Sequence, residues 1–456
     1  MSSHEGMKEK GFGSKIGFVL AAAGSAVGLG NIWRFPYLAA KYGGGVFLII
    51  YITLAVTFGF TLMLTEIAIG RRTGKSVIGA YSSINKHFSF LGWLAALVPV
   101  IITPYYCVIG GWVLKYLTMF LCGEGKSTAE NESFFGSFIG STAQPTIFFI
   151  IFLAITAIVV MFGVKKGIER ISKVMMPILV LLTLGITIYT LTLKGAGEGL
   201  KYYLLPNFEG FTVAKLLKTI AAAMGQLFYS MSIAMGILVT YGSYMRKEDS
   251  LEQSVRQIEL FDTGIAVLAG LIIVPAVFIF SGGDSAALNA GPGLMFITLP
   301  KVFESMAGGQ IVGATFFVLV ALAALTSSIS LMETVVSIIM EKFNLKRIPA
   351  CLITFGICLL LGMLSVLGYS AWSSVEIFGM QFLDFFDFIS NNLMMPVVAL
   401  VTCILIGWVE KVQFVEMEVL VSAEKFRSKG LVSVMLRFVC IVCMVIIIVT
   451  PFVTDI

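Results

Sequence analysis

Long apolar stretches alternate along this chain with short polar segments, and most of the apolar stretches reach the length of a membrane span, about 20 residues. They predict about eleven spanning α-helices, over residues 15–40, 46–70, 90–122, 145–163, 172–193, 213–244, 256–280, 310–341, 349–368, 376–409 and 432–452. A membrane β-barrel would instead show short segments of alternating polarity. We therefore expect an all-α polytopic membrane protein.

The composition supports this class of protein. Hydrophobic residues make up 58% of the chain and charged residues only 12%, whereas a soluble protein carries about 25% charged residues. The net charge of +5 comes from basic residues in alternate loops, so it indicates topology and not nucleic-acid binding. Cys440 and Cys443 lie within a predicted span, which favours helix packing over a redox or metal pair.

The basic residues predict how the chain is threaded through the membrane. Lys and Arg gather in the loops 71–86, 165–173, 246–256, 342–347 and 411–429. Because basic loops face the cytoplasm, we expect a cytoplasmic N-terminus and an outside C-terminus. The outside loop 123–143 is short, which favours a bacterial cell membrane. The first apolar segment is too long for a cleavable signal peptide, so none is expected.

One stretch inside the first predicted span is a poor helix. Gly24, Gly28 and Gly30 each cost about 1 kcal/mol relative to Ala in a helix interior. Asn31 and Arg34 follow at a depth where lipid would disfavour both. Irregular backbone at membrane depth needs protein or a water-filled cavity around it, and broken helices are how many transporters bind ions. We therefore predict a break in this helix.

The span at 213–244 also has a weak centre. Ser230 and Ser232 cannot share one face of a helix, which an unwound segment would resolve. The alternative is a continuous helix in which both hydroxyls bond back to carbonyls. Interruptions in the first and sixth spans predict two inverted five-helix repeats with a site between them. The predicted division is a cytoplasmic segment 1–14, a first repeat 15–193, an extracellular loop 194–212, a second repeat 213–409, and a cytoplasmic loop with helix 11 in 410–456.

Polar residues at membrane depth are the candidates for chemistry. Thr326 and Ser327 offer adjacent hydroxyls, and hard cations prefer oxygen ligands, although hydroxyls also serve ordinary helix packing. Ionisable groups within spans are functional candidates, with structural pairing as the alternative for each. They are Arg34, Glu66, Lys115, Asp262, Glu333, Asp384 and Asp387.

At several places the chain closely resembles one family of transporters. The run from Gly24 to Pro36 resembles the first helix of the neurotransmitter:sodium symporter family. The resemblance continues at 105–106, 226–236, 240–244, 323–333 and 383–388, in order along the first ten helices.

The resemblance implies two sodium sites. The groups matching the first are carbonyls and hydroxyls of Gly24, Val27, Ala323, Thr326 and Ser327. Those matching the second, which also touches the substrate carboxylate, belong to Ala26, Asn31, Ser230 and Asp262. Position 262 is commonly Asn in relatives, and chloride-dependent relatives carry Ser where this chain has Ala266. A fixed carboxylate at Asp262 would replace the anion, so we predict chloride independence.

The resemblance also implies an amino-acid site. Relatives that carry biogenic amines have Asp where this chain has Gly28, so Gly28 favours a substrate with its own carboxylate. The pocket is apolar, which favours an aliphatic or aromatic side chain. The matching substrate residues are Ala26, Gly28, Leu29, Gly30, Ile102, Tyr106, Tyr229, Ser230, Ser232, Met235, Ser327 and Leu331.

The gates of such a transporter can be placed in the same way. Arg34 and Asp387 match the outer gate, and Tyr244 and Glu341 match the inner gate. The family's N-terminal Arg and Trp are replaced here by Lys8 or Lys10 and by Phe12.

The function implied is sodium-coupled import of a hydrophobic amino acid by alternating access, with the bilayer, sodium and the amino acid as partners. A sodium-dependent sensor that does not transport is the alternative. The apolar pocket argues against a cation channel. An enzyme is not expected, because the chain lacks the H-E-x-x-H and G-x-S-x-G motifs. The oligomeric state is not indicated.

Overall fold

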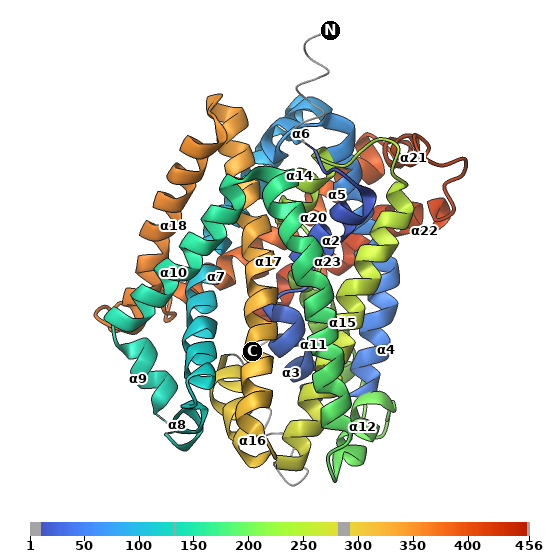
Figure 1. Ribbon diagram of the computed structural model, residues 1–456. Coiled ribbons are helices and arrows are strands. Elements are labelled where there is room, and N and C mark those ends of the chain that lie inside the picture. The colour runs from blue at the N-terminus through green and yellow to red at the C-terminus, as the bar shows by residue number, and fades with distance from the viewer. Residues whose placement is uncertain (1–10, 132, 281–291, 454–456) are drawn as a thin grey trace.

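The computed structural model describes residues 11–131, 133–280 and 292–453, whose regular structure is helical apart from two isolated β-bridges. Long helices run through the middle of the molecule and short helices gather at its two ends (Figure 1). The segments α6 (Val77–Ile84) and α21 (Gln413–Val419) lie at one end, and α8 (Gly125–Glu130), α12 (Ala196–Leu204) and α16 (Leu299–Ser305) lie at the other. Loops expected on opposite sides of the membrane thus lie at opposite ends.

Nine helices among the described residues are long and apolar enough to cross a membrane, and a bent pair makes a tenth span. The pair is Lys15–Ala26 with Gly30–Lys41. The nine are Gly45–Thr73, Lys86–Leu121, Ala143–Met161, Val164–Leu191, Leu251–Phe280, Gly309–Phe343, Arg347–Tyr369, Phe382–Val409 and Lys429–Val449. The all-α membrane class is confirmed.

Within these spans, and in the segment 213–243 between two of them, the elements have the following bounds. The first four spans contain α2 (Lys15–Ala26), η1 (Gly30–Arg34), α3 (Phe35–Lys41), α4 (Gly45–Leu54), η2 (Ala55–Gly59), α5 (Phe60–Thr73), α7 (Ser89–Leu121) and α10 (Ala143–Met161). The next contain η4 (Val164–Glu169), α11 (Arg170–Leu191), α13 (Val213–Ser230), α14 (Ile237–Ser243), α15 (Leu251–Phe280) and α17 (Gly309–Phe343). The last contain α18 (Arg347–Tyr369), α19 (Phe382–Asp387), η7 (Phe388–Met394), α20 (Met395–Ile404), η8 (Leu405–Val409), α22 (Lys429–Val434), η9 (Met435–Val439) and α23 (Cys440–Val453).

The predicted break in the first span is confirmed. The helix α2 begins after Ser14, whose hydroxyl accepts a hydrogen bond from the Gly17 N–H, and it ends at Ala26. Val27 is extended, with φ −73° and ψ 100°, and the helix resumes at Gly30 after a bend of 55°. Residues 21–32 are all buried, so the irregular backbone lies inside the protein and not in lipid.

The predicted break in the sixth span is also present. The helix α13 ends at Ser230, and α14 begins at Ile237. Between them Ser232 and Ala234 have positive φ angles of 54° and 63°, which are uncommon for residues other than Gly. The Ala234 N–H donates to Glu66 Oε1 at 2.8 Å, so a buried carboxylate supports the unwound backbone.

This second break explains why a count by length and composition alone falls short of the expected eleven spans. The helix α14 has only seven residues, and α13 carries Lys215 and Lys218 near its start. Neither piece is a long apolar helix, so the count by length and composition is nine or ten. Among the described residues between α15 and α17, η6 (Leu294–Thr298) is followed directly by α16.

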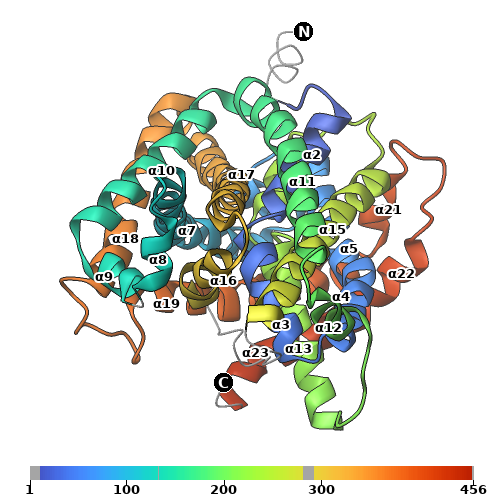
Figure 2. The same cartoon turned by 60° about the horizontal axis from the view of Figure 1, so that its bottom comes forward.

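The two breaks lie against each other at the centre of the fold. The second half of the first span, starting with η1, contacts α13, and α2 contacts α14. The helix α17 packs along α2 and lies beside α7, as the view in Figure 2 shows. Short helices that the sequence did not predict also occupy the loops, among them η3 (Lys86–Phe88) and α9 (Phe134–Gly140).

Candidate functional site

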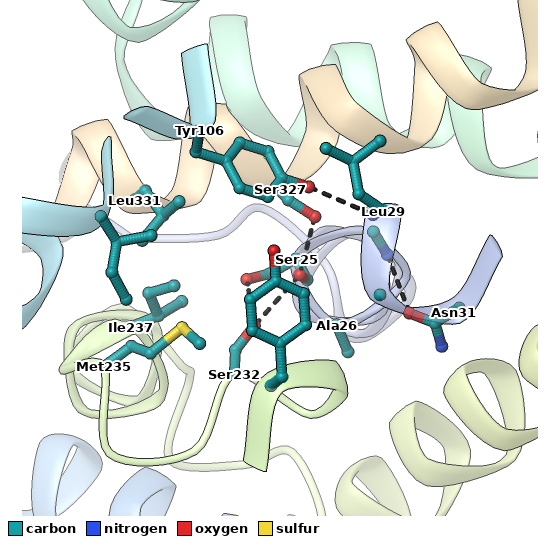
Figure 3. A pocket seen from close by; sticks show the side chains of 14 residues that line it. Ser25, Ala26, Leu29, Asn31, Tyr106, Ser232, Met235, Ile237, Ser327 and Leu331 are labelled. Atoms are coloured by element: carbon teal, nitrogen blue, oxygen red, sulfur yellow. Dashed lines mark hydrogen bonds between the residues drawn. The ribbon is translucent and has the colours of Figure 1, made fainter. Parts of the chain in front are cut away.

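A pocket of about 330 Å³, including its opening to solvent, lies between the two breaks (Figure 3). Its lining residues come from the first and sixth spans, at and next to their breaks, and from α7 and α17. They are Ser25, Ala26, Gly28, Leu29, Gly30, Asn31, Ile102, Tyr106, Tyr229, Ser232, Met235, Ile237, Ser327 and Leu331. Every predicted substrate residue except Ser230 lines it.

Two lining residues, Ser25 and Ile237, were missed by the sequence analysis. Ser25 directly precedes the predicted pocket residue Ala26, and its hydroxyl inside the predicted helix break could have marked it as a pocket residue. Ile237 opens α14, and nothing in an apolar helix start marks it as a pocket residue.

Backbone N–H groups of the first break point toward polar side chains of the pocket. The Gly28 N–H donates to Asn31 Oδ1 at 3.1 Å, and the Leu29 N–H donates to the Tyr106 hydroxyl at 3.3 Å. A Cβ on Gly28 would lie 2.7 Å from Ser327 Oγ and 2.9 Å from the Tyr106 hydroxyl oxygen. Any side chain at position 28 would therefore displace the groups that face the pocket.

Oxygen atoms converge between α2 and α17, where the first sodium site is expected. Ser327 Oγ lies 3.0 Å from the Ser25 carbonyl, 3.3 Å from that of Val27 and 3.4 Å from that of Gly24. Val27 is the residue at which α2 ends, and its carbonyl accepts from the Ser327 hydroxyl. The neighbouring Thr326 hydroxyl donates to the Ala323 carbonyl at 3.0 Å. The five residues predicted for this site therefore lie together with Ser25, and their carbonyl and hydroxyl oxygens are hard donors that fit an alkali-metal ion.

A second polar cluster surrounds Asp262, where the second sodium site is expected. Asp262 Oδ1 accepts from Asn31 Nδ2 at 2.7 Å and from the Ser230 hydroxyl at 2.8 Å. Asp262 Oδ2 has no hydrogen-bond partner among the described residues, and the side chain is fully buried. An unpartnered buried carboxylate oxygen is costly unless a cation compensates it. The cluster thus fits a cation as well as a structural network.

The predicted outer-gate residues are near the pocket but do not form an ion pair. The Arg34 guanidinium lies over the ring of Tyr229, 5.2 Å from its centroid. Asp387 Oδ1 instead accepts from Asn391 Nδ2 at 2.6 Å and from the Tyr105 hydroxyl at 3.1 Å. The Tyr229 ring therefore separates the pocket from the cation above it.

The predicted inner-gate tyrosine takes part in a buried ionic network. The Tyr244 hydroxyl donates to Glu333 Oε1 at 2.8 Å. Arg347 from α18 donates to both oxygens of Glu333, at 2.6 and 2.9 Å, and to the carbonyl of Val160 at 3.0 Å. Glu333, noted only as an intramembrane carboxylate, thus joins the end of the sixth span to α18 and α10.

The N-terminal segment covers this network. Phe12 is buried, packs edge-to-face on Tyr244 with ring centroids 6.4 Å apart, and donates its N–H to the Tyr244 carbonyl at 3.1 Å. Glu341, the other predicted inner-gate residue, accepts from the Ser76 N–H at 2.5 Å. Lys8 and Lys10 lie outside the described residues.

The remaining intramembrane charges have structural partners. The Lys115 ammonium lies 5.9 Å from the ring centroid of Phe134 and 5.8 Å from that of Phe148. Asp384 accepts from the Tyr369 hydroxyl at 3.1 Å. Neither residue reaches the pocket.

Comparison with known proteins identifies the family. The model of the sodium:neurotransmitter symporter family matches residues 9–126 and 135–455. An uncharacterized sodium-dependent transporter of Bacillus subtilis, YhdH, is 38% identical over 397 residues, which cover 86% of each chain. One from Haemophilus influenzae is 34% identical over 415 residues, covering 87% of this chain and 89% of the relative.

A solved structure has the same architecture. The crystal structure of MhsT in complex with L-phenylalanine matches with a TM-score of 0.87 and 35% sequence identity, over 97% of this chain and 100% of that one. The predicted all-helical fold with a broken first helix is therefore confirmed. The matching family and relatives are transporters and not enzymes. This chain is a multi-pass, sodium-dependent transporter that belongs to the sodium:neurotransmitter symporter family.

Proposed function

We propose that the protein imports a hydrophobic amino acid together with sodium by alternating access. The observation that carries this proposal is the pair of facing helix breaks, which expose peptide groups beside a buried carboxylate with one unpartnered oxygen. MhsT, whose fold this chain shares, is solved with L-phenylalanine bound, which supports an amino-acid substrate.

The pocket offers complementary groups for each part of a zwitterion. The carboxylate is held by the N–H groups of Leu29 and Gly30, at the start of the second half of the broken helix, and by the Tyr106 hydroxyl. The ammonium group faces the Ala26 and Tyr229 carbonyls and the Ser232 hydroxyl. The apolar side chain lies among Ile102, Met235, Ile237 and Leu331, which are all buried.

Two sodium ions are transported with the amino acid in this proposal. One binds the oxygens around Thr326 and Ser327, and the other binds Asp262, Asn31 and Ser230 beside the substrate carboxylate. Because Asp262 supplies a fixed negative charge, transport does not require chloride. Two sodium ions moving down a tenfold gradient and a 100 mV potential release about 7 kcal/mol, enough for about 10⁵-fold accumulation of a zwitterion.

The gates follow from the same arrangement. The Tyr229 ring and Arg34 close the outer side, aided by Asp387. Tyr244 and Glu341 hold the inner side closed. The halves 15–193 and 213–409 form the two inverted repeats, with the N-terminus in the cytoplasm of a bacterial cell.

Counterflow in proteoliposomes tests the function directly. Vesicles preloaded with unlabelled L-phenylalanine should accumulate labelled L-phenylalanine in sodium, with or without chloride, and not in potassium. Competition by other amino acids then ranks the substrates. Sodium-dependent binding without counterflow would instead support a sensor that does not transport, and dependence on chloride would refute the role given to Asp262.

A further inference from the structure

Three serine hydroxyls meet where the two helix breaks adjoin α17. Ser25 Oγ lies 2.7 Å from Ser330 Oγ and 3.2 Å from Ser232 Oγ. All three serines are buried. Ser25 and Ser232 line the pocket, as Figure 3 shows, whereas Ser330 does not.

The protons of this cluster can be assigned by counting donors. Each hydroxyl has one proton and can accept two hydrogen bonds. Ser330 donates its proton to the Ser327 carbonyl at 2.7 Å, and Ser232 donates its proton to the Ser25 carbonyl at 3.1 Å. The Ser25 proton then has two acceptors within reach, and the Ser330 oxygen is the nearer one.

This assignment gives the hydroxyls a direction. Ser25 donates to Ser330, and Ser330 donates to the Ser327 carbonyl. No proton of the cluster is then directed at Ser232 Oγ, so its acceptor positions are free to face the pocket. An ammonium group is a donor of charged hydrogen bonds, which are about twice as strong as neutral ones.

We propose that Ser330, although outside the pocket, positions the substrate amine by drawing the Ser25 proton away from Ser232 Oγ. The inference rests on the proposed amino-acid substrate, and it adds a residue that touches neither the substrate nor sodium. Ser330 is a positioning residue, because it acts through Ser25.

Removal of the Ser330 hydroxyl has a specific consequence. In Ser330→Ala the Ser25 proton turns to Ser232 Oγ, 3.2 Å away, and takes one of the two acceptor positions of that oxygen, which leaves the ammonium group a single position. The loss of one hydrogen bond weakens amino-acid binding about two- to twelvefold. In the double variant Ser25→Ala/Ser330→Ala the competing proton is gone, so affinity returns toward the wild-type value.

This recovery separates the proposal from simple damage to the fold. If Ser330 were only structural, loss of the Ser25 hydroxyl would add to the damage, and the double variant would bind no better than Ser330→Ala. Ser328 is a matched control, because it lies on the same helix and is fully buried. Its hydroxyl donates to the Leu325 carbonyl and pairs with Thr156 of α10, both at 2.9 Å, away from the breaks.

The test is equilibrium binding of labelled L-phenylalanine to purified full-length variants in sodium. We expect weaker binding in Ser330→Ala, recovery in the double variant and no change in Ser328→Ala. The rise in melting temperature that sodium alone produces should be unchanged in Ser330→Ala. If that variant does not fold, Ser330→Cys replaces it with the same expectation, because a thiol is a weak acceptor.

Two results would overturn the proposal while leaving the proposed function intact: wild-type affinity in Ser330→Ala, or a double variant that binds no better than the single one. Failure of the wild-type protein to bind any amino acid in sodium would overturn the proposed function itself, and this inference with it.

Discussion

Replacement of Asp262 by Asn tests the electrostatic role of the second cluster. Oδ1 accepts two hydrogen bonds, from Asn31 and Ser230, so the amide oxygen of the new side chain takes that place. The amide NH₂ group then occupies the position of the unpartnered Oδ2, where the proposed sodium ion binds. A cation thus loses a full negative charge and meets a donor in its place.

The expected loss of sodium affinity is large. Two unit charges 4 Å apart at an effective dielectric constant of 20 attract each other by about 4 kcal/mol, which is about 10³-fold in a binding constant. The fully buried setting of Asp262 makes screening by water weak. We therefore expect Asp262→Asn to raise the sodium concentration needed for half-maximal L-phenylalanine binding by at least tenfold and at most about 10³-fold.

The assay is a sodium titration of L-phenylalanine binding, in chloride and in gluconate. Asp384→Asn is the control, since Asp384 is exposed and bonds Tyr369 away from the pocket. Adding Ala266→Ser to Asp262→Asn should restore binding in chloride but not in gluconate, because an anion then supplies the missing charge. An unchanged sodium dependence in Asp262→Asn would refute the reasoning.

Three further substitutions test other parts of the site. In Gly30→Ala the new Cβ would lie 2.4 Å from Cδ1 of Tyr229. Overpacking of this kind costs about 1–3 kcal/mol, so L-phenylalanine binding should weaken by about five- to 150-fold. Wild-type affinity in this variant would contradict the contact. Tyr244→Phe removes a hydrogen bond to the buried carboxylate of Glu333, which is worth about 1.5–3 kcal/mol. Exchange of the backbone amide hydrogens of α2 should therefore accelerate. Unchanged exchange would exclude a gating role for Tyr244. Thr326→Val removes a hydroxyl from the first sodium site. The sodium concentration that gives half-maximal thermal stabilisation should therefore rise about tenfold or more. An unchanged sodium titration would place the ion elsewhere.

The two helix breaks were predictable because they leave a chemical signature in the sequence. Three glycines close together weaken the first span, and Ser230 and Ser232 cannot share one helical face in the sixth. The identity of the pocket residues came from family resemblance and not from spacing. Ser25 and Ile237 were missed because their roles depend on where the unwound backbone turns.

Other features depend on tertiary contacts that the sequence does not display. Val56 lies in the π-helical turn η2, and its carbonyl accepts from Arg256 of α15 at 3.2 Å. The short helices in the loops have too few residues for a periodic pattern. The spacing of residues along the sequence also does not determine which partner a buried charge binds. Asp387 accepts hydrogen bonds from Tyr105 and Asn391 and does not pair with Arg34.

Reciprocal binding of sodium and amino acid tests the central claim most directly. If one ion and the substrate carboxylate share the site between the two breaks, sodium must raise the affinity for L-phenylalanine, and L-phenylalanine must raise the affinity for sodium by the same factor. Titration of each ligand at low and saturating concentrations of the other, on the purified wild-type protein, measures both factors. Equal factors well above one are predicted, and independent binding of the two ligands would contradict the account.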